Sequence, residues 1–253
     1  MLPDFSNEII KSLIDLSLDA GEKILEFYKT DIKVREKIDK SLVTEADEKA
    51  ETIILQGLAK LTPQIPAIGE ESYSAGTRHN ISKGLFWLVD ALDGTKEFVN
   101  KRREFTVNIA LIHNGKAIFG IVHAPAIART FWGGPFGAFS KNKKTTKKIS
   151  TRKAPKEGIT VVSSRSHRDG ENNLLTNYDV KNIINIGSSL KLCLIAAGEA
   201  DLYPRLGPTS EWDTAAGHAI LTAAGGTLTQ INGSPFLYGK DSILNPSFIA
   251  KGQ

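Results

Sequence analysis

Several features that mark whole classes of protein are missing from this chain or nearly so. Its 253 residues include a single cysteine, so no disulfide can form within the chain, which agrees with a reducing compartment. No apolar run approaches the roughly 18 residues that a membrane span needs. The N-terminus lacks the basic and apolar segments of a cleaved secretory signal. We therefore expect a globular cytoplasmic protein.

The chain also has only a small excess of positive over negative side chains. The formal net charge is +4, which suits an anionic substrate or an anionic membrane surface and by itself identifies neither. The strongest shift in composition is the lysine-rich run at 141–148, which we predict to be a solvated loop or linker, with an anionic contact surface as the alternative. Cys193 lies in an apolar helical pattern, which predicts a buried core residue rather than a nucleophile.

The first part of the chain alternates helical and extended patterns. Apolar residues at helical spacing predict helices at 7–28 and from about residue 45 to Pro63, with a short strand at 33–38 between them. Asn-Gly at 114–115 predicts a hairpin over 105–123, and a second hairpin is expected over 131–139.

We place a domain boundary near residue 155, between an N-terminal α+β domain (1–154) and a C-terminal α/β domain (155–253). In the second part, strands are predicted at 159–163 and 182–186, and a short extended piece at 201–204. Helices are predicted at 188–198 and from Glu211 to about Ala224. The alternation of strands and helices indicates a layered arrangement.

The stretch Trp87 to Thr95 brings together the features of a functional turn. An apolar strand is expected to end near Val89, and Asp90 and Asp93 follow three residues apart, so that a turn would bring both carboxylates toward one point. Gly94 relieves backbone strain there, and Thr95 is placed to cap a helix beginning at Lys96. The alternative is an ordinary Asp-Gly hairpin turn.

Three further carboxylates stand at predicted element ends, and each also has a structural interpretation. Thr44 and Asp47 have the spacing of a helix capping box. Glu70 lies in Gly69-Glu70-Glu71-Ser72, which on its own reads as a solvated turn. Asp213 suits the N-cap of the alanine-rich helix. The sequence alone leaves both interpretations open for each residue.

Convergence of Glu70, Asp90, Asp93 and Asp213 would require cations. Two unit charges about 4 Å apart repel by roughly 4 kcal/mol at an effective dielectric of 20. Carboxylate oxygens, together with a carbonyl such as that of Leu92, favour Mg²⁺ or Mn²⁺, and no thiolate or paired-imidazole spacing suggests zinc. The amides of Gly94 and Thr95 would favour a phosphate. Water could then attack a phosphate ester, with Thr95 and Asp47 orienting and deprotonating it and Glu70 assisting.

Three segments carry a resemblance to a known family. Gly69 to Ser72, Trp87 to Thr95 and Trp212 to Gly217 resemble, in this order, the signatures of the inositol monophosphatase-like, Mg²⁺-dependent and lithium-sensitive phosphatases, over nearly the whole chain. The resemblance implies an α/β/α/β/α sandwich and two or three Mg²⁺ ions, replaceable by Mn²⁺. It implies metal ligation by Glu70, Asp90, Leu92, Asp93 and Asp213, and activation of water by Asp47 with Thr95. Ala91 departs from the usual proline without removing a ligand.

Other segments resemble the bisphosphate nucleotidases of this family, namely 96–98, 104–110, 187–191 and 203–209. The implied reaction removes the 3′-phosphate of adenosine 3′,5′-bisphosphate, and also acts on the 5′-phosphosulfate analogue, in sulfur assimilation. The substrate would contact Glu70, Leu92, Asp93, Gly94, Thr95 and Asp213. Ser188 and Arg205 are candidates for holding the nucleotide, although Arg205 also suits a structural ion pair.

The resemblance leaves two alternative functions. An inositol phosphate or another sugar phosphate would keep the chemistry and change the substrate. A non-catalytic anion-binding regulatory protein would use the basic run instead, but four metal-directed carboxylates argue against it. Family members are monomers or homodimers, some of them on the cytoplasmic face of the inner membrane, so peripheral contact through the basic run is an expectation; no nucleic-acid partner is expected.

Overall fold

The computed structural model describes residues 3–37, 41–82, 84–165 and 174–253. Its helical elements are α1 (Asn7–Tyr28), α2 (Glu45–Leu61), α3 (Glu70–Ser74), α4 (Thr95–Val99), the 3-10 turn η1 (Pro125–Ile127), α6 (Leu190–Ala196) and α7 (Glu211–Ala223). Its strands are β1 (Val34–Glu36), β2 (Leu42–Thr44), β3 (Ala67–Gly69), β4 (Leu85–Asp93), β5 (Thr106–His113), β6 (Lys116–Ala124), β7 (Arg129–Gly134), β8 (Gly137–Lys141), β9 (Thr146–Ile149), β10 (Ile159–Ser163), β11 (Val180–Asn185), β12 (Leu202–Arg205), β13 (Thr227–Gln230) and β14 (Phe248–Lys251).

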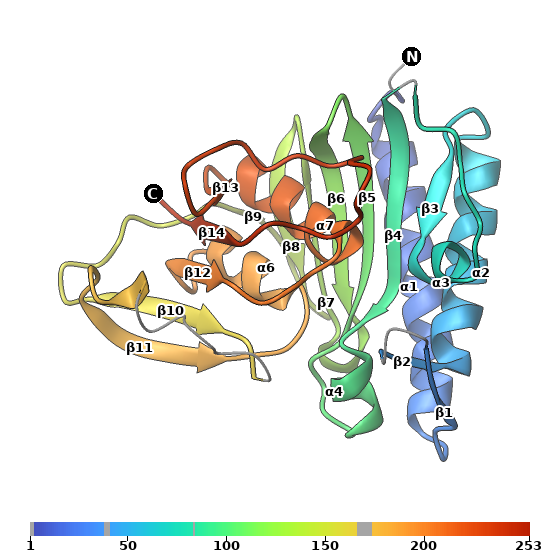
Figure 1. Cartoon of the computed structure of the whole chain (residues 1–253), viewed down its shortest axis with the longest axis horizontal. Coiled ribbons are helices and arrows are strands. Elements are labelled where there is room, and N and C mark those ends of the chain that lie inside the picture. Colours follow the sequence, from blue (N-terminus) through green and yellow to red (C-terminus); the bar gives the residue numbers. More distant parts are fainter. Residues whose placement is uncertain (1–2, 38–40, 83, 166–173) are drawn as a thin grey trace.

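A seven-stranded sheet in the order β3-β4-β5-β6-β7-β8-β9 forms the centre of the molecule (Figure 1). Only β3 and β4 are parallel, and the other neighbours are antiparallel. The hairpin at Asn114-Gly115 is confirmed: both residues have positive φ, as the tight turn between right-twisted strands requires. The hairpin of β7 and β8 is confirmed as well.

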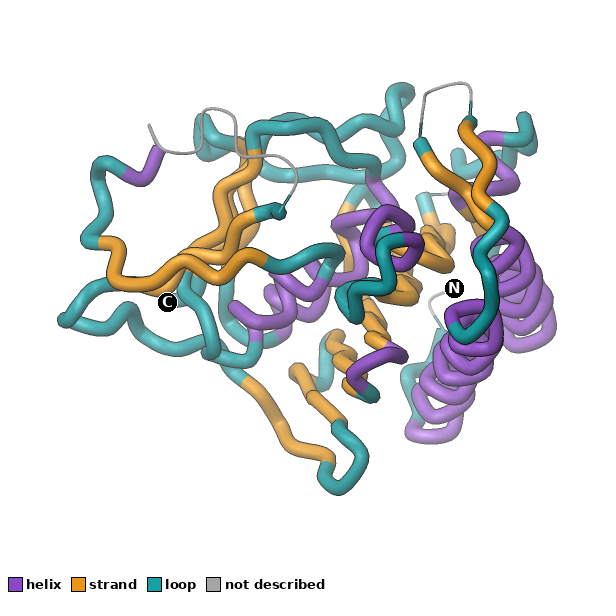
Figure 2. Tube along the Cα trace, turned by 90° about the horizontal axis from the view of Figure 1, so that it is seen from below, coloured by secondary structure: helices purple, strands orange, loops and turns teal. Residues whose placement is uncertain are grey.

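One face of this sheet is covered by α1 and α2, which run side by side (Figure 2). Residues alternate across a strand, so the Trp87 and Val89 side chains of β4 face these helices. They pack with Leu13 of α1 and Ile54 of α2. The capping box predicted at the start of α2 is confirmed, with Thr44 as the N-cap.

The opposite face of the sheet packs on α6 and α7, which lie between it and a second sheet. The second sheet has the order β11-β10-β12-β14-β13. The core on this side joins Phe86 of β4, Ile220 of α7 and Phe248 of β14, so residues from both parts of the chain share one apolar cluster. The buried position of Cys193 in this cluster confirms its assignment to the core.

Four of the five layers expected for the sandwich are formed by these elements: helices, sheet, helices, sheet (Figure 1). A small apolar cluster of the second sheet, formed by Ile159, Val161 and Leu202, packs with the partly buried Leu175, Val180 and Ile249. The predicted strand over 33–38 is present as β1, although residue 38 lies outside the described residues.

Two local predictions were wrong. The lysine-rich run at 141–148 is solvent-exposed as predicted, but only residues 142–145 form a loop, because the ends of the run belong to β8 and β9, which pair as the edge hairpin of the central sheet. Lysines on an exposed edge discourage pairing with another chain, so this charge pattern fits an edge strand as well as a loop. Gly69 to Ser72 is not a simple turn either, since Glu70 begins the short helix α3.

Candidate active site

An irregularity in β4 brings Asp90 and Asp93 to the same face of the sheet. Asp90 pairs with Asn108 of β5 and Asp93 pairs with Thr106, so three steps along β4 match two along β5. One extra residue reverses the side-chain alternation. The strand therefore continues through both aspartates, and the turn predicted after Val89 was wrong. The expected convergence of the carboxylates is achieved by a bulge instead.

Gly94 ends the strand and begins α4. Its φ of 92° lies in the left-handed region, and a Cβ atom there would stand 2.9 Å from the Glu104 carbonyl oxygen. Only glycine suits this position without strain. Gly94 is the N-cap and Thr95 the first helical residue, so the predicted capping role of Thr95 was wrong. The Thr95 hydroxyl is left for other contacts.

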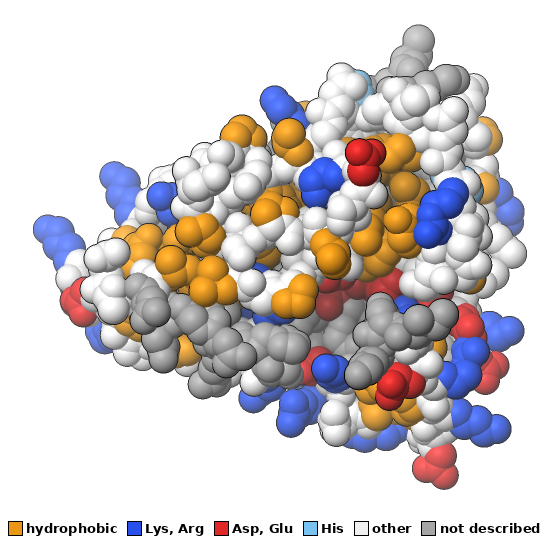
Figure 3. Space-filling view, viewed as in Figure 1, with side chains coloured by type: hydrophobic (Ala, Val, Ile, Leu, Met, Phe, Trp, Pro, Cys, Tyr) orange, Lys and Arg blue, Asp and Glu red, His pale blue; other side chains and the backbone are white. Residues whose placement is uncertain are grey.

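Glu70 and Asp213 complete a carboxylate cluster with Asp90. Ligand atoms of these three residues all lie within 4.8 Å of one another. Asp213 reaches the cluster from the first turn of α7, where Ser210 is the N-cap and Asp213 is the third helical residue of a capping box. The predicted N-cap role of Asp213 was therefore wrong by three positions, although Asp213 still takes part in the cap. Acidic side chains are visible near the centre of the face in Figure 3.

The electrostatics of the cluster reflect its burial. Loss of solvent raises the pKa of Asp90 well above its usual range, and the charges of Glu70, Asp93 and Asp213 raise it further. Burial likewise raises the pKa of Asp213, followed by repulsion from Asp93 and Glu70. Burial also raises the pKa of Glu70, against the opposing effect of Lys37. The metal-free cluster thus resists full ionisation.

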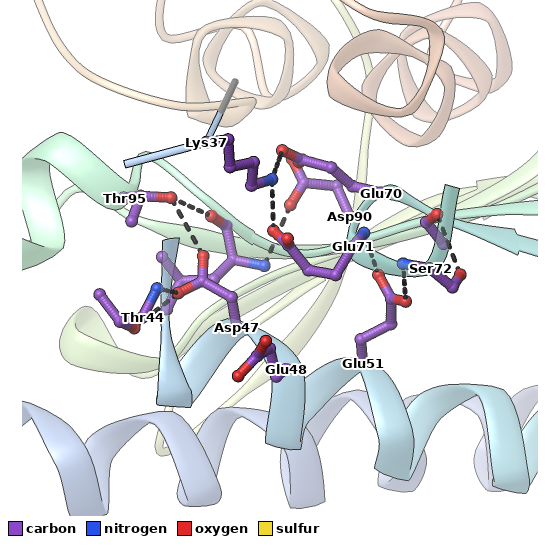
Figure 4. Close-up of polar contacts among 12 residues, drawn as sticks. Lys37, Thr44, Asp47, Glu48, Glu51, Glu70, Glu71, Ser72, Asp90 and Thr95 are labelled. Atoms are coloured by element: carbon purple, nitrogen blue, oxygen red, sulfur yellow. Dashed lines mark hydrogen bonds and ion pairs between the residues drawn. The ribbon is translucent and has the colours of Figure 1, made fainter. Parts of the chain in front are cut away.

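Lys37 forms an ion pair with Glu70 of this cluster. Its Nζ atom donates to Glu70 and Glu71 at 2.7 Å each (Figure 4). Burial lowers the pKa of Lys37, but the charges and hydrogen bonds of the two glutamates outweigh this effect and raise its pKa overall. Lys37 was not a predicted site residue, and no spacing in the sequence distinguishes it from other lysines.

Each aspartate at the site has one carboxylate oxygen held by the protein. Leu92 N donates to Asp90 Oδ1 at 3.0 Å, and Ser210 N donates to Asp213 Oδ2 at 2.7 Å. Ser189 N donates to Asp93 Oδ2 at 2.6 Å, and Ser189 Oγ lies 2.8 Å from the same oxygen. Such contacts orient a carboxylate and leave its other oxygen available to a cation.

Asp47 stands behind Thr95, outside the residues that line the cavity. Its Oδ2 atom accepts hydrogen bonds from Thr44, and its Oδ1 atom accepts one from Thr95 Oγ1 at 3.1 Å (Figure 4). Thr95 Oγ1 also lies 3.2 Å from the Leu92 carbonyl oxygen. A hydroxyl has one proton, so Thr95 donates to one of these acceptors at a time. Burial raises the pKa of Asp47, although the hydrogen bonds from Thr44 and Thr95 oppose this effect.

A cavity of about 520 Å³ connects the carboxylates with the C-terminal part of the chain. The predicted residues that line it are Glu70, Asp90, Leu92, Asp93, Gly94, Thr95, Ser188, Arg205 and Asp213. Arg205 forms no ion pair in the described part of the chain, and its guanidinium donates to the carbonyl oxygens of Gly207 and Pro208. The alternative of a structural ion pair therefore finds no partner among the described residues.

Lys191 lines the same cavity and was missed by the sequence analysis. Its Nζ atom donates to the Ser188 carbonyl oxygen at 2.6 Å. The pKa of Lys191 is lowered to about 8, mainly by burial; the charge of Asp93 opposes this effect and the charge of Arg205 adds to it. The signal in the sequence was a single charge within the otherwise apolar helix Leu190–Ala196.

The carboxylate cluster fits a divalent cation. Its donors are all oxygens, they lie close together, and burial makes their unneutralised charge unfavourable. Asp93 is not among the residues whose ligand atoms all lie within 4.8 Å of one another, but it lines the cavity beside them.

A layered α/β fold with a buried, oxygen-only carboxylate cluster beside cationic side chains defines a metal-dependent phosphatase. The profile of the inositol monophosphatase family matches residues 6–252. The chain belongs to this family.

Named relatives agree with this assignment. The 3′(2′),5′-bisphosphate nucleotidase CysQ of Salmonella typhimurium is 43% identical over 248 residues, covering 95% of this chain and 98% of the relative. CysQ of Escherichia coli K12 is 42% identical over 244 residues, with the same coverage.

Solved structures show the same fold. CysQ of Bacteroides thetaiotaomicron superimposes with a TM-score of 0.82 at 34% identity, covering 98% of both chains. An inositol monophosphatase of Thermotoga maritima gives a TM-score of 0.80 at 25% identity, over 97% of this chain and 92% of that one. Within the described residues, no helix is both long and apolar enough to traverse a bilayer.

Proposed function

We propose that this chain is a Mg²⁺-dependent 3′(2′),5′-bisphosphate nucleotidase that converts adenosine 3′,5′-bisphosphate and water to AMP and phosphate. The observation that carries the proposal is the composition of one cavity, which is lined both by the carboxylate cluster and by the buried cations Lys191 and Arg205. A bisphosphate offers one anionic group to the cluster with its cations and a second to Lys191 and Arg205. The family resemblance places this reaction in sulfur assimilation.

The proposed metal ligands are Glu70, Asp90, Asp93, Asp213 and the carbonyl oxygen of Leu92. Two or three bound Mg²⁺ ions, or Mn²⁺ in their place, would neutralise the scissile phosphate and lower the pKa of water near it. The amides of Gly94 and Thr95 add donors for the same phosphate, since both residues line the cavity at the start of α4.

Thr95 and Asp47 form a path for the proton of the attacking water. Thr95 faces the cavity, and its hydroxyl is within hydrogen-bond reach of Asp47 Oδ1. As water attacks phosphorus, Thr95 Oγ1 accepts its proton and passes its own to Asp47. The raised pKa of Asp47, caused by burial, makes it a better proton acceptor than an exposed aspartate. The bond from phosphorus to the 3′-oxygen breaks, and that oxygen takes a proton from a second water molecule. The hydroxide left by that water is neutralised when Asp47 gives up the proton that it received.

The nearest alternative is inositol phosphate or another sugar phosphate. Inositol 1-phosphate carries one phosphate, so it would leave Lys191 and Arg205 without an anion. A phosphate-release assay separates the alternatives. It compares adenosine 3′,5′-bisphosphate, inositol 1-phosphate and fructose 1,6-bisphosphate, first with Mg²⁺ and then with EDTA. We expect the nucleotide to be preferred. Equal or faster turnover of inositol 1-phosphate contradicts the proposal. If none of the substrates is turned over in a metal-dependent way, the result favours a non-catalytic anion-binding protein.

A variant of Lys191 sharpens this test. Lys191→Met removes the charge and keeps much of the apolar stem, which contacts the cavity wall. We expect the KM for adenosine 3′,5′-bisphosphate to rise about tenfold or more, because a hydrogen bond to a charged group contributes roughly 1.5–3 kcal/mol. The KM for 3′-AMP, which lacks the 5′-phosphate, should change little. Lys148→Met, an exposed lysine on β9, is the matched control.

Four further properties stay predictions from the family resemblance: a monomeric or dimeric state, lithium sensitivity, a cytoplasmic location and peripheral contact with the inner membrane.

A further inference from the structure

Ser189 joins three elements at the edge of the carboxylate cluster. It is the N-cap of α6 and is almost fully buried. Its Oγ atom lies 2.8 Å from Asp93 Oδ2 on β4 and 2.7 Å from the carbonyl oxygen of Asp213 on α7. Its backbone N–H donates to the same Asp93 oxygen at 2.6 Å. One serine thus contacts two proposed metal ligands, one from each part of the chain.

Asn108 of β5 defines the direction of these hydrogen bonds. Its Nδ2 atom lies 2.8 Å from Ser189 Oγ and 3.4 Å from Asp93 Oδ2. The amide group must face the carboxylate with its N–H₂ side, because two acceptors would repel. Ser189 Oγ therefore accepts from Asn108, and its single proton goes to Asp93 or to the Asp213 carbonyl oxygen.

These contacts orient the carboxylate of Asp93. Its Oδ2 atom faces Ser189 N, Ser189 Oγ and Asn108 Nδ2, whereas its Oδ1 atom has no donor in the described part of the chain. Asp93 sits next to the β-bulge, where regular pairing with β5 has just been interrupted. The backbone of β4 alone therefore does not fix the direction of its carboxylate.

We infer that Ser189 is a positioning residue for the metal site: it orients the Asp93 carboxylate and ties it to Asp213, so that the two ligands act on the same cations. This inference rests on the proposed function. Hydrogen bonds from neighbouring residues to a metal ligand change metal affinity or activity by about 10–100-fold when removed.

The test is calorimetric titration of the full-length protein with Mn²⁺ in the absence of substrate. Ser189→Ala removes the hydroxyl and keeps the N–H. We expect its dissociation constant for Mn²⁺ to rise by about 10–100-fold. We also expect the Mg²⁺ concentration for half-maximal turnover to rise in parallel, while kcat at saturating Mg²⁺ falls much less. Ser17→Ala, which removes a fully buried hydroxyl on α1 far from the site in the sequence, is the control for loss of a buried serine.

Asn108→Leu provides a second variant of similar volume that leaves Ser189 in place, and it carries the test if Ser189→Ala does not fold. Because the two residues share one network, their effects on Mn²⁺ affinity should not be additive in the double variant. Unchanged Mn²⁺ affinity in folded Ser189→Ala or in Asn108→Leu overturns the inference while leaving the proposed function intact. A wild-type protein that binds no Mn²⁺ overturns both.

Discussion

At the scale of single residues, Glu51 shows how a buried side chain supports the site without touching the cavity. Its carboxylate lies under α3 and accepts from Glu71 N at 2.7 Å and from Ser72 N at 2.8 Å (Figure 4). These amides belong to the first turn of α3, whose first residue is Glu70. Gly69 leaves room for the contact, since a Cβ atom there would stand 2.3 Å from the Glu51 carboxyl carbon.

Glu51→Gln should weaken both stability and metal binding. A glutamine has one acceptor oxygen, so one of the two amides would face an N–H₂ group. Leaving a buried donor unsatisfied costs about 1–3 kcal/mol in the free energy of unfolding, which urea denaturation measures. The Mg²⁺ concentration for half-maximal turnover should rise, because the first turn of α3, which carries Glu70, is held less firmly when Glu51 no longer accepts from both amides.

Glu48→Gln is the control, since Glu48 lies on the same helix and its ion pair with Arg35 is solvent-exposed. Exposed pairs contribute at most about 1 kcal/mol. Equal stability and equal metal dependence in the two variants would show that Glu51 does not support α3.

At the scale of elements, the site is a meeting point of β4, α3 and α7. Each presents a carboxylate from its end or its first turn, where the backbone leaves regular pairing or has N–H groups without helical partners. Burial raises the pKa of Asp90 and Asp213, and it raises that of Glu71 to about 7 against the effect of Lys37.

These shifts predict the pH dependence of stability in EDTA. A carboxyl group with a raised pKa keeps its proton to higher pH when folded than when unfolded. The contribution of such a group to the free energy of unfolding is therefore fully present below its pKa in the unfolded chain, about 4. This contribution is lost as the pH rises through its pKa in the folded protein. Burial lowers the pKa of His123 and His218 to about 4, which makes stability rise with pH up to about 6.5, the usual pKa of histidine. We therefore expect the Tm of the metal-free protein to fall between about pH 6.5 and about pH 8, and added Mg²⁺ to restore it.

Asp90→Asn isolates the contribution of the cluster to this effect. We expect a smaller fall in Tm with pH than in wild type, together with loss of most phosphatase activity, because the neutral amide removes repulsion and a proposed ligand. Asp19→Asn, an exposed change on α1, should leave the wild-type profile. A variant profile as steep as that of wild type would contradict the assigned origin of the pKa shifts.

At the scale of the whole molecule, the boundary near residue 155 separates two sheets but not two cores. Phe86 and Val122 of the central sheet share an apolar cluster with Ile220 of α7 and Phe248 of β14. A polar contact crosses the same boundary, since Glu104 accepts from Arg165 and from Gly187 N. Neither part can expose its half of this cluster without a large loss of buried apolar area.

We therefore expect one cooperative unfolding transition in differential scanning calorimetry, with equal calorimetric and van't Hoff enthalpies. Glu104→Gln, which weakens the polar contacts of Glu104 across the boundary and leaves the shared apolar cluster in place, should leave the transition single. Two separate transitions would show that the parts before and after residue 155 unfold independently.

Much of this molecule could be predicted from local pattern. Periodicity identified α1, α2 and α7, and Asn114-Gly115 identified its hairpin, because these depend on neighbours within a few residues in sequence. The lysine-rich run was misassigned because exposed edge strands and loops share a polar composition. The three family signatures identified the carboxylates, and the structure confirmed that Glu70, Asp90 and Asp213 converge.

The sequence by itself therefore determined the family, the class of chemistry and the residues that carry the acidic charge. Only the tertiary structure decided how they meet. The extra residue in β4 turns Asp93 to the face of Asp90, and α6 brings Ser189 and Lys191 from about a hundred residues away in the chain to the same cavity. Pattern reasoning missed these two residues because their roles depend on long-range hydrogen bonds and charge, whose partners no local sequence spacing specifies.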